Sequence, residues 1–397
     1  MSFSALLLST ADWDRPVWTN KQHMALRLAA GGRVIYVNSL GLRRPSARPD
    51  DLLRVARRVL RPGRGRGAGP AAAPRPPGLR VVDPLVLPYH RLRHPVWDLN
   101  RRLLEHAVRA WLERPAGERI LWTYSPVTYG LERHAAATVY HCVDLLAGFP
   151  RVDATAIAEG EARLARAGAT ALASSRTIER HLRASGFAHV ELWENVADSR
   201  LVEEESRGEE REPSTAAFVG NLSPYKVDFA LLRRLVEDLP RLRLELAGPE
   251  AEGGGGAPEL AWFRGHPRVT VRPTLAPAEM ARLLGRASVG LVPYLLNDYT
   301  SGVFPMKVYE YLAAGLPVVT TALPSLEGAD EVTWCKDAGA FLRQVGAELG
   351  LPHPADVERR RALARSRSWD ARGAQALFLV ERLLAKAPEP LAARAPR

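Results

Sequence analysis

The sequence predicts an α/β protein made of two Rossmann-like, doubly wound domains that face a cleft. Apolar, strand-like runs alternate with amphipathic helical segments over residues 4–196, and the same alternation resumes at residue 215. Residues 198–215 between them are polar and acid-rich and show no apolar periodicity, which is typical of a linker. The length of 397 residues suits two domains of about 200 residues each.

The first strand-helix alternation predicts an N-terminal domain over residues 1–197, followed by the linker over 198–215. The second predicts a C-terminal domain over 216–370, and residues 371–397 read as a helix and tail, with packing of this helix on the N-terminal domain left open. Because ligands of such sheets bind beyond the carboxyl ends of the strands, we expect the site in the cleft between the domains. The expected strands are 4–10, 33–39, 118–125, 137–144, 169–175, 189–196, 215–221, 241–248, 268–273, 288–294 and 317–321.

The positive charge is concentrated in one segment. The formal net charge is +11, and residues 43–80 carry eleven arginines against two aspartates. The proline- and glycine-rich part at 61–78 cannot build a core, so 43–80 reads as a flexible basic insertion. It is either a tether to an anionic membrane surface or a solvated linker. The rest of the chain is nearly neutral and shows neither a helix-turn-helix nor an RNP-type strand, so we expect no nucleic-acid partner.

The remaining composition points to a cytoplasmic protein without metal or cofactor. Cys142 and Cys335 are too few for a disulfide framework, and no apolar run approaches the length of a spanning helix. We therefore expect a cytoplasmic location, with peripheral attachment to the inner face of the membrane if the insertion binds lipid. Asp12 and Asp14 form a D-x-D pattern, but they follow too little chain to belong to a metal motif, and no other cluster has metal-ligand spacing.

The richest chemistry lies in residues 298–321. Ser301 and Gly302 predict a tight turn, Pro305 suits the first helical position and Gly315 suits the helix end. The expected helix over 305–314 offers free amide groups and a positive dipole to a phosphate.

Two charged side chains on this expected helix are unusually placed. Lys307 in the first turn opposes the helix dipole, and a bound diphosphate would resolve the conflict. Glu310 lies among apolar residues and needs donors, which the hydroxyl groups of a ribose could supply. The alternative is a plain Lys307–Glu310 salt bridge on a solvated helix face.

The segment SGVFPMKVYEYLAAGLPVVTT (301–321) resembles the nucleotide-sugar-binding element of GT-B glycosyltransferases, in particular bacterial enzymes of glycosyltransferase family 4 and the GumK- and TuaH-like group. Weaker similarity runs along most of the chain except residues 43–116 and the linker. The resemblance implies that Glu310 binds the ribose of the donor. It also implies that Lys307 and the amides around Val303 and Phe304, after the turn at Ser301, face the diphosphate.

Other positions carry the resemblance with departures. Gly220 and Asn221 match the turn after the first strand of the C-terminal domain, although an Arg is common where Asn221 stands. Lys226 lies near the place of a second phosphate-contacting Lys. Gly302 stands where family 4 enzymes usually carry a Glu, so the resemblance does not imply a retaining mechanism based on that Glu.

A general base would lie in the N-terminal domain. Asp144 ends the strand at 137–144 and is the first candidate, because GumK-like enzymes use an Asp of this domain. The alternative is that Asp144 caps the following turn or helix. His23 and Asp12, which both follow the first strand, are further candidates. His141 reads as a packed core histidine.

The sequence therefore predicts a glycosyltransferase of the hexosyltransferase type. It would use a nucleotide-diphosphate sugar as donor. By resemblance alone, it would use a glycan or lipid-linked glycan of the cell envelope as acceptor. A nucleotide-sugar 2-epimerase on the same fold is the first alternative, and a nucleic-acid-binding protein is a distant second.

Overall fold

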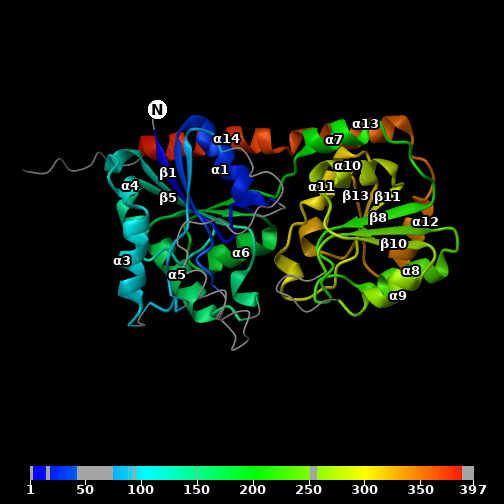
Figure 1. The fold of residues 1–397 in the computed structure, drawn as a ribbon, viewed down its shortest axis with the longest axis horizontal. Coiled ribbons are helices and arrows are strands. Elements are labelled where there is room, and N and C mark those ends of the chain that lie inside the picture. The colour runs from blue at the N-terminus through cyan, green and yellow to red at the C-terminus, as the bar shows by residue number, and fades with distance from the viewer. Residues whose placement is uncertain are drawn as a thin grey trace, which may run out of the picture. The chain divides into compact units, whose positions relative to one another are not determined.

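The computed structural model describes residues 3–14, 18–42, 75–87, 89–92, 95–149, 151–250 and 257–386. The chain divides into two compact units (Figure 1). The first comprises residues 1–194 and 373–397, and the second comprises residues 195–372. The helix α14 (Trp369–Lys386) begins in the second unit and belongs to the first from Gly373 onward.

The first unit is built on a seven-stranded sheet with the order β3-β2-β1-β4-β5-β6-β7. Its neighbouring strands all pair in parallel within the described residues. The chain order reverses between β1 and β4, so the carboxyl ends of these two strands form the switch point at which such sheets bind ligands. The strands are β1 (Ser4–Leu8), β2 (Arg33–Val37), β3 (Leu79–Val82), β4 (Arg119–Thr123), β5 (Ala137–Cys142), β6 (Thr170–Ala173) and β7 (His189–Leu192).

Helices cover the first sheet on two faces (Figure 1). On one face α14 packs on α1, where the Leu377 side chain meets Gly31. On the other face α6 packs against β6 and β7. The helices described in this unit are α1 (Asn20–Gly31), α3 (Trp97–Ala107), α4 (Arg109–Leu112), α5 (Ala154–Arg166), α6 (Arg176–Ala184) and the second part of α14.

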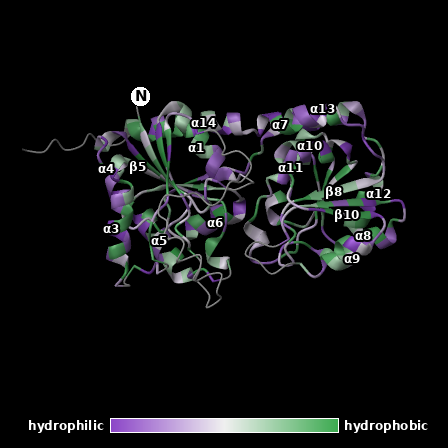
Figure 2. Cartoon of the chain, viewed as in Figure 1, coloured by the Kyte–Doolittle hydropathy of each residue, from purple (hydrophilic) through white to green (hydrophobic). Residues whose placement is uncertain are grey.

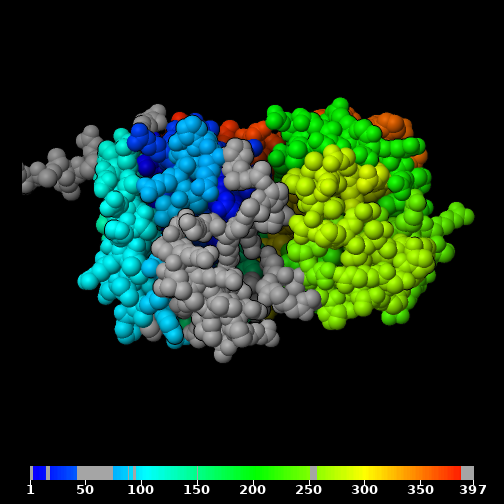
Figure 3. All heavy atoms as spheres, in the orientation of Figure 1, coloured from blue at the N-terminus to red at the C-terminus, as the bar shows by residue number. Residues whose placement is uncertain are grey.

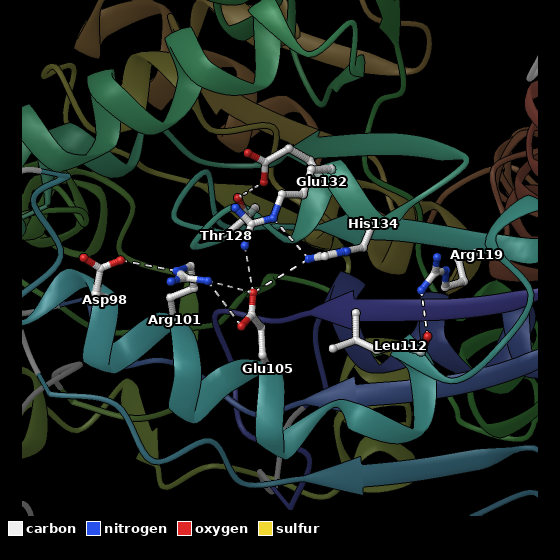
Figure 4. Close-up of polar contacts among 9 residues, drawn as sticks. Asp98, Arg101, Glu105, Leu112, Arg119, Thr128, Glu132 and His134 are labelled. Carbon is white, nitrogen blue, oxygen red and sulfur yellow. Dashed lines mark hydrogen bonds and ion pairs between the residues drawn. The ribbon is translucent and has the colours of Figure 1, made fainter. Parts of the chain in front are cut away.

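A partly exposed polar network joins α3 to the turn between β4 and β5, and α4 to β4 itself (Figure 4). The helix α3, cyan in Figure 3, lies at the surface of the first unit. Its Glu105 accepts from Arg133 at 2.8 Å and from Arg101 at 3.5 Å. Arg119 of β4 donates to the carbonyl of Leu112 in α4 at 2.8 Å. Since solvent screens exposed ion pairs, these contacts orient the helices more than they stabilise the unit.

The second unit is built on a six-stranded parallel sheet with the order β10-β9-β8-β11-β12-β13. Its switch point lies between β8 and β11. One helical layer contains α7, α10, α11 and α13, and the other contains α8, α9 and α12 (Figure 1). The strands are β8 (Thr215–Val219), β9 (Arg243–Ala247), β10 (Val269–Arg272), β11 (Val289–Val292), β12 (Val318–Thr321) and β13 (Val332–Cys335). The helices are α7 (Ser199–Ser206), α8 (Phe229–Asp238), α9 (Leu260–Gly265), α10 (Pro277–Arg286), α11 (Lys307–Ala313), α12 (Ala338–Ala347) and α13 (Pro354–Ser366).

Each predicted strand is present. Most are shortened by one or two residues at one or both ends, and the strand predicted at 189–196 ends four residues early, at Leu192. The central strands are almost fully buried, and Figure 2 shows mainly hydrophobic residues along them. Parallel strands covered by helices on both faces need such apolar runs, which is why the sequence signal is strong. Two strands were missed, β3 and β13. Both are half-buried edge strands without an apolar run. The predicted doubly wound α/β class is confirmed.

The segment expected to be a linker contains a helix. Asp198 caps α7 by accepting from the amide of Leu201, and Val202 is buried. Glu205 pairs with Arg282 at 2.6 Å and Glu209 pairs with Arg286 at 2.9 Å, which docks this acidic segment on α10. The polar composition that suggested a linker therefore belongs to one face of a packed helix and to the turn after it.

The expected basic insertion at 43–80 ends earlier than predicted. Leu79 and Arg80 already belong to β3, where Leu79 pairs with Val34 of β2. Residues 43–74, with most of the arginines of the insertion, lie outside the described residues. Among the residues that the structure describes, no helix is both long enough and apolar enough to cross a membrane.

Candidate functional site

At the carboxyl ends of β8, β9 and β11 in the second unit, the predicted Gly220 and Lys307 lie beside two residues that were not predicted, Gly248 and Tyr294. Gly220 follows β8, Gly248 follows β9 and Tyr294 lies two residues beyond β11. Lys307 opens α11, which follows β11 after a segment without regular strand or α-helix. The site therefore lies at the switch point between β8 and β11, where the topology leaves the strand ends open to a ligand.

Two glycines make room at this edge of the sheet. Gly248 has φ +145°, and a Cβ there would lie 2.0 Å from the carbonyl oxygen of Gly220. Gly220 has φ +152°, and its Cβ would lie 3.0 Å from both Cε and Nζ of Lys307. Side chains rarely adopt these backbone angles. The glycines thus allow β8 and β9 to approach each other and allow the lysine to lie directly over the end of β8.

We expect Gly248→Ala to destabilise the protein. The backbone conformation alone costs about 1–3 kcal/mol for a residue with a side chain, and the clash with the Gly220 carbonyl adds to this. Urea denaturation measures the change in unfolding free energy. Gly346→Ala in α12 is the matched control, because its Cβ meets Leu239 at an ordinary 3.5 Å and alanine favours helices. Equal stability of the Gly248→Ala variant and the wild type would contradict the tight approach.

The ammonium group of Lys307 is buried beside aromatic rings. The residue is 9% exposed, and its Nζ donates to the Tyr294 hydroxyl at 2.5 Å. The same Nζ lies 5.4 Å from the centre of the Phe218 ring and 5.0 Å from that of Tyr294. Among the described residues, no carboxylate forms a salt bridge with Lys307. A buried ammonium without a carboxylate partner is costly, and an anionic ligand would compensate it.

A second ammonium group approaches the same phenol. Lys226 places its Nζ 5.0 Å from the centre of the Tyr294 ring and 5.7 Å from that of Tyr299. Burial alone would raise the pKa of Tyr294, but the charges and hydrogen bonds of Lys226 and Lys307 outweigh it and lower this pKa. The structure thus brings together two predicted residues, Lys226 and Lys307, which are far apart in sequence, around one hydroxyl group.

Glu310 is half-buried on α11. Its carboxylate makes no hydrogen bond or salt bridge to any of the described residues, so the alternative of a Lys307–Glu310 salt bridge is wrong for these residues. Burial raises the pKa of Glu310, the charge of Lys307 opposes this, and the charge of Asp198 adds to it. A carboxylate that lacks donors in the protein is suited to accept hydrogen bonds from a ligand.

The helix that carries these residues differs from the expected one. α11 begins at Lys307 rather than at Pro305, because Thr300–Gly302 form a 3-10 turn and the chain then runs irregularly up to Met306. The helix ends as predicted, since Gly315 follows it with φ +79°. With seven residues, α11 offers less of a dipole to a phosphate than the longer expected helix.

The turn residues expected to face a diphosphate are partly engaged within the protein. The amide of Val303 donates to the carbonyl of Thr300 at 3.1 Å, and the carbonyl of Phe304 accepts from Asn195 at 2.7 Å. Ser301 donates its hydroxyl to the carbonyl of Asp298 at 3.0 Å.

Two further predicted positions lie in turns near these strand ends. Asn221 accepts from the Ser223 hydroxyl at 2.5 Å in the turn after β8. Gly302 closes the 3-10 turn before α11. Both positions shape the turns that carry Lys226 and Lys307.

In the first unit, Asp144 lies next to a buried lysine. Its side chain is 26% exposed, and its Oδ2 lies 3.9 Å from Nζ of Lys21 in α1. Lys21 also lies 5.4 Å from the centre of the Tyr124 ring, just beyond β4. Asp144 does not cap the 3-10 helix at Leu146–Gly148, whose N-cap residue is Leu145. Asp144 is therefore at the carboxyl edge of the first sheet, in reach of solvent.

The other two candidate bases are in less suitable surroundings. Burial, with the charge of Arg27, lowers the pKa of His23 to about 3, so its imidazole is a weak base near neutral pH. The Asp12 carboxylate accepts a hydrogen bond from the amide of Ser39 at 3.2 Å, so it has a structural role. His141 is 3% exposed and stacks on Tyr124 with a centroid distance of 4.8 Å, as expected for a core histidine.

Sequence reasoning missed Tyr294 and Asp198. Tyr294 was read as the last residue of a buried strand, and Asp198 as part of a linker. In the sequence, the signal for Tyr294 would have been a hydroxyl-bearing residue at the end of the strand next to the switch point. Within the described ranges, no group of three or more His, Cys, Asp or Glu side chains could hold a metal ion.

Comparison with known proteins agrees with this geometry. Residues 213–347, which include the site of the second unit, match the model of the family described as glycosyl transferases group 1. The chain is 30% identical over 173 residues to a protein of Bacillus subtilis (strain 168) that carries the name teichuronic acid biosynthesis glycosyltransferase TuaH. This alignment covers 40% of the chain and 41% of the relative, so the chain spans less than half of the length of the relative that it matches.

Solved structures share the fold over nearly the whole chain. Sucrose-phosphate synthase from Thermosynechococcus elongatus superposes with a TM-score of 0.68 at 17% identity, covering 96% of this chain and 99% of the other. Anabaena Alr3699/HepE, crystallised in complex with UDP, superposes with a TM-score of 0.60 at 12% identity, covering 96% and 100%. At these identities the likeness shows the fold alone, which is GT-B. The predicted resemblance to GT-B glycosyltransferases and the TuaH-like group is confirmed.

Proposed function

We propose that this protein is a glycosyltransferase that moves a sugar from a nucleotide-diphosphate donor to a glycan or lipid-linked glycan acceptor. The observation that carries the proposal is the buried ammonium group of Lys307, which has no carboxylate partner among the described residues and lies at the switch point of the second sheet. Lys226 adds a second ammonium group beside it. Two cations at the carboxyl ends of parallel strands suit a diphosphate.

The donor site follows from the same residues. The diphosphate would accept from the remaining N–H donors of the two lysines while Tyr294 keeps its hydrogen bond to Lys307, and the ribose hydroxyl groups would donate to Glu310. During transfer, the bond between the anomeric carbon and the diphosphate breaks, and the leaving group takes the bonding electrons. The lysines stabilise this developing negative charge. In this proposal the chain supplies all of the cations, without a metal or cofactor. The complex of UDP with a protein of the same fold supports a nucleotide of this kind.

Donor binding is tested by thermal shift with UDP-, GDP- and dTDP-linked sugars, because a ligand that binds the folded state raises its apparent stability. The expected result is a rise in melting temperature with one nucleotide class and none with free sugars. Absence of a shift with all of these nucleotides at millimolar concentration would contradict the proposed function.

The acceptor base is proposed to be Asp144 in the first unit. The acceptor hydroxyl attacks the anomeric carbon and gives its proton to the Asp144 carboxylate. The ammonium group of Lys21 orients this carboxylate. Asp144→Asn should lower turnover by about 100- to 10,000-fold, whereas UDP-sugar or GDP-sugar affinity should stay unchanged. Steady-state kinetics with calorimetry measures both. Asp98→Asn, at an exposed position of α3, is the control, and near-normal turnover of Asp144→Asn would exclude this base.

The alternative of a nucleotide-sugar 2-epimerase has no support in these relatives, which are named as a glycosyltransferase and a synthase. Incubation with the donor alone separates the two activities, since an epimerase converts the donor without an acceptor. A cytoplasmic location remains a proposal from the sequence. A membrane tether through residues 43–80 also remains one, because residues 43–74 lie outside the described residues.

A further inference from the structure

Tyr294 is a buried phenol at the point where the two lysines of the donor site meet. It is 1% exposed, and its hydroxyl accepts from Nζ of Lys307 at 2.5 Å. Lys226 approaches the same hydroxyl from the segment after β8. A hydroxyl oxygen has two lone pairs, so it can accept from two ammonium donors. This arrangement places a lysine of α11 and a lysine of a different loop at one phenol.

Hydrogen bonds around Tyr294 hold its segment next to the segment that carries Lys226. Val227 and Tyr294 form an antiparallel bridge, and the amide of Leu295 donates to the carbonyl of Lys226 at 2.9 Å. Asn297 donates to the carbonyl of Tyr225 at 2.7 Å. The segment after β8 and the segment after β11 are thus joined along several residues, and the separation of Lys226 from the Tyr294 ring follows from this joining.

Without an anion, two ammonium groups at one point repel each other. Phe218, whose ring packs edge-on to Tyr294 with a centroid distance of 6.2 Å, offers Lys307 no hydrogen-bond acceptor. Tyr311, on the same side, uses its hydroxyl to accept from the amide of Val219 at 2.9 Å. The phenol oxygen of Tyr294 is therefore the side-chain acceptor that the described residues supply to Lys307.

We propose that Tyr294 is a positioning residue for the donor, whose phenol oxygen holds the ammonium groups of Lys226 and Lys307 together so that both meet the diphosphate of the nucleotide sugar. This proposal rests on the proposed function. The phenol acts through the lysines and takes no part in bond making or breaking. Its contribution is to offset the repulsion between the lysines before the donor arrives, so that less reorganisation is needed on binding.

The direct test is Tyr294→Phe, which removes the oxygen and keeps the ring. We expect the affinity for UDP, or for GDP if that is the nucleotide bound, to fall by about 10-fold or more, because the hydrogen bond from the charged Lys307 is lost and the phenol oxygen no longer offsets the repulsion between the two ammonium groups. Affinity for the nucleoside monophosphate should fall less. Calorimetry measures both. Tyr225→Phe is the matched control: it removes a hydroxyl group next to Lys226 at a residue that is 38% exposed.

A second readout needs no ligand. The charges of Lys226 and Lys307 lower the pKa of Tyr294 against its burial, while burial raises that of neighbouring Tyr311. A titration followed by tyrosinate absorbance should therefore show one tyrosine that ionises early in the wild type. This step should be absent in Tyr294→Phe and should shift to higher pH in Lys307→Met, which loses one of the two ammonium groups. The shift in Lys307→Met tests the coupling even if Tyr294→Phe fails to fold.

The outcomes separate this inference from the proposed function. Unchanged diphosphate affinity in Tyr294→Phe, or equal losses for the diphosphate and the monophosphate, would overturn the positioning role and leave the donor site intact. A wild type without an early-ionising tyrosine would overturn the coupling between the three residues. A wild type that binds no nucleoside diphosphate but shows the early ionisation would contradict the proposed function while the coupling stands.

Discussion

Lys307→Met should lower kcat/KM with the nucleotide-sugar donor by about 100- to 1,000-fold, the effect of removing one group that stabilises charge in a transition state. The fold should survive, because methionine keeps most of the side-chain volume between Phe218 and Tyr294 and places no charge in this buried site. The ligand-free protein should be at least as stable as the wild type, since burying an ammonium group without a carboxylate partner is costly. Steady-state kinetics and thermal unfolding of the same preparations measure both effects.

Lys336 provides a matched control for this experiment. Lys336, one of five lysines in the chain, is exposed in the second unit. Lys336→Met makes the same chemical change in the same unit without touching the site, and it should leave kcat/KM unchanged. If the Lys307 variant kept wild-type kinetics, the ammonium group would not contact the donor, and the two-cation site would be wrong.

Glu310→Gln should weaken nucleotide binding and stabilise the ligand-free protein at the same time. Two ribose hydroxyl groups that donate to a carboxylate form charge-assisted hydrogen bonds, and their loss should lower affinity by about 10- to 100-fold. Glutamine keeps the shape of the side chain but accepts hydrogen bonds less strongly. Calorimetry with UDP or GDP, according to the nucleotide that binds, measures this loss.

The stability effect of Glu310→Gln follows from the pKa shift. Burial raises the pKa of Glu310 in the folded state, so the folded protein holds this proton more tightly than the unfolded chain does. The unfolding free energy contributed by this group is therefore lost as the pH rises from the unfolded pKa through the folded pKa. At neutral pH the ionised carboxylate destabilises the wild type, and the neutral amide of glutamine removes this penalty. Urea denaturation at pH 4 and pH 7 should show the gain at pH 7.

Two controls sharpen the result for Glu310. Glu327→Gln changes an exposed carboxylate in the same unit and should alter neither affinity nor stability. The 2′,3′-dideoxy form of the nucleoside diphosphate lacks the ribose hydroxyl groups, so wild type and Glu310→Gln should bind it equally. A loss of affinity for the dideoxy form as large as that for the ribose form would show that Glu310 acts elsewhere than on the ribose.

Much of the fold could be predicted because burial leaves a clear pattern in the chain. β1, β6 and β11 are buried along their entire length, and each appears in the sequence as an apolar run. The edge strands β3 and β13 have one side open, so their composition resembles that of a loop. The segment at 198–215 was misread for a related reason. α7 buries a narrow face around Val202, and the ion pairs of α7 and the turn after it with α10 connect residues that are more than seventy positions apart.

The sequence by itself determined the two-fold alternation of strands and helices, the family resemblance, and the identity of Lys307 and Glu310 as unusual charges on one short helix. These are local properties, since a lysine that opposes a helix dipole and a glutamate among apolar neighbours are visible within ten residues. The tertiary structure decided that Glu310 forms no salt bridge with Lys307, and that Lys226 and Lys307 both lie at the phenol of Tyr294. It also decided that Gly220 leaves room for the side chain of Lys307, and that Gly248 leaves room for the carbonyl of Gly220. These features depend on strand order, which brings the ends of β8, β9 and β11 together across about eighty residues of chain and which no local pattern encodes.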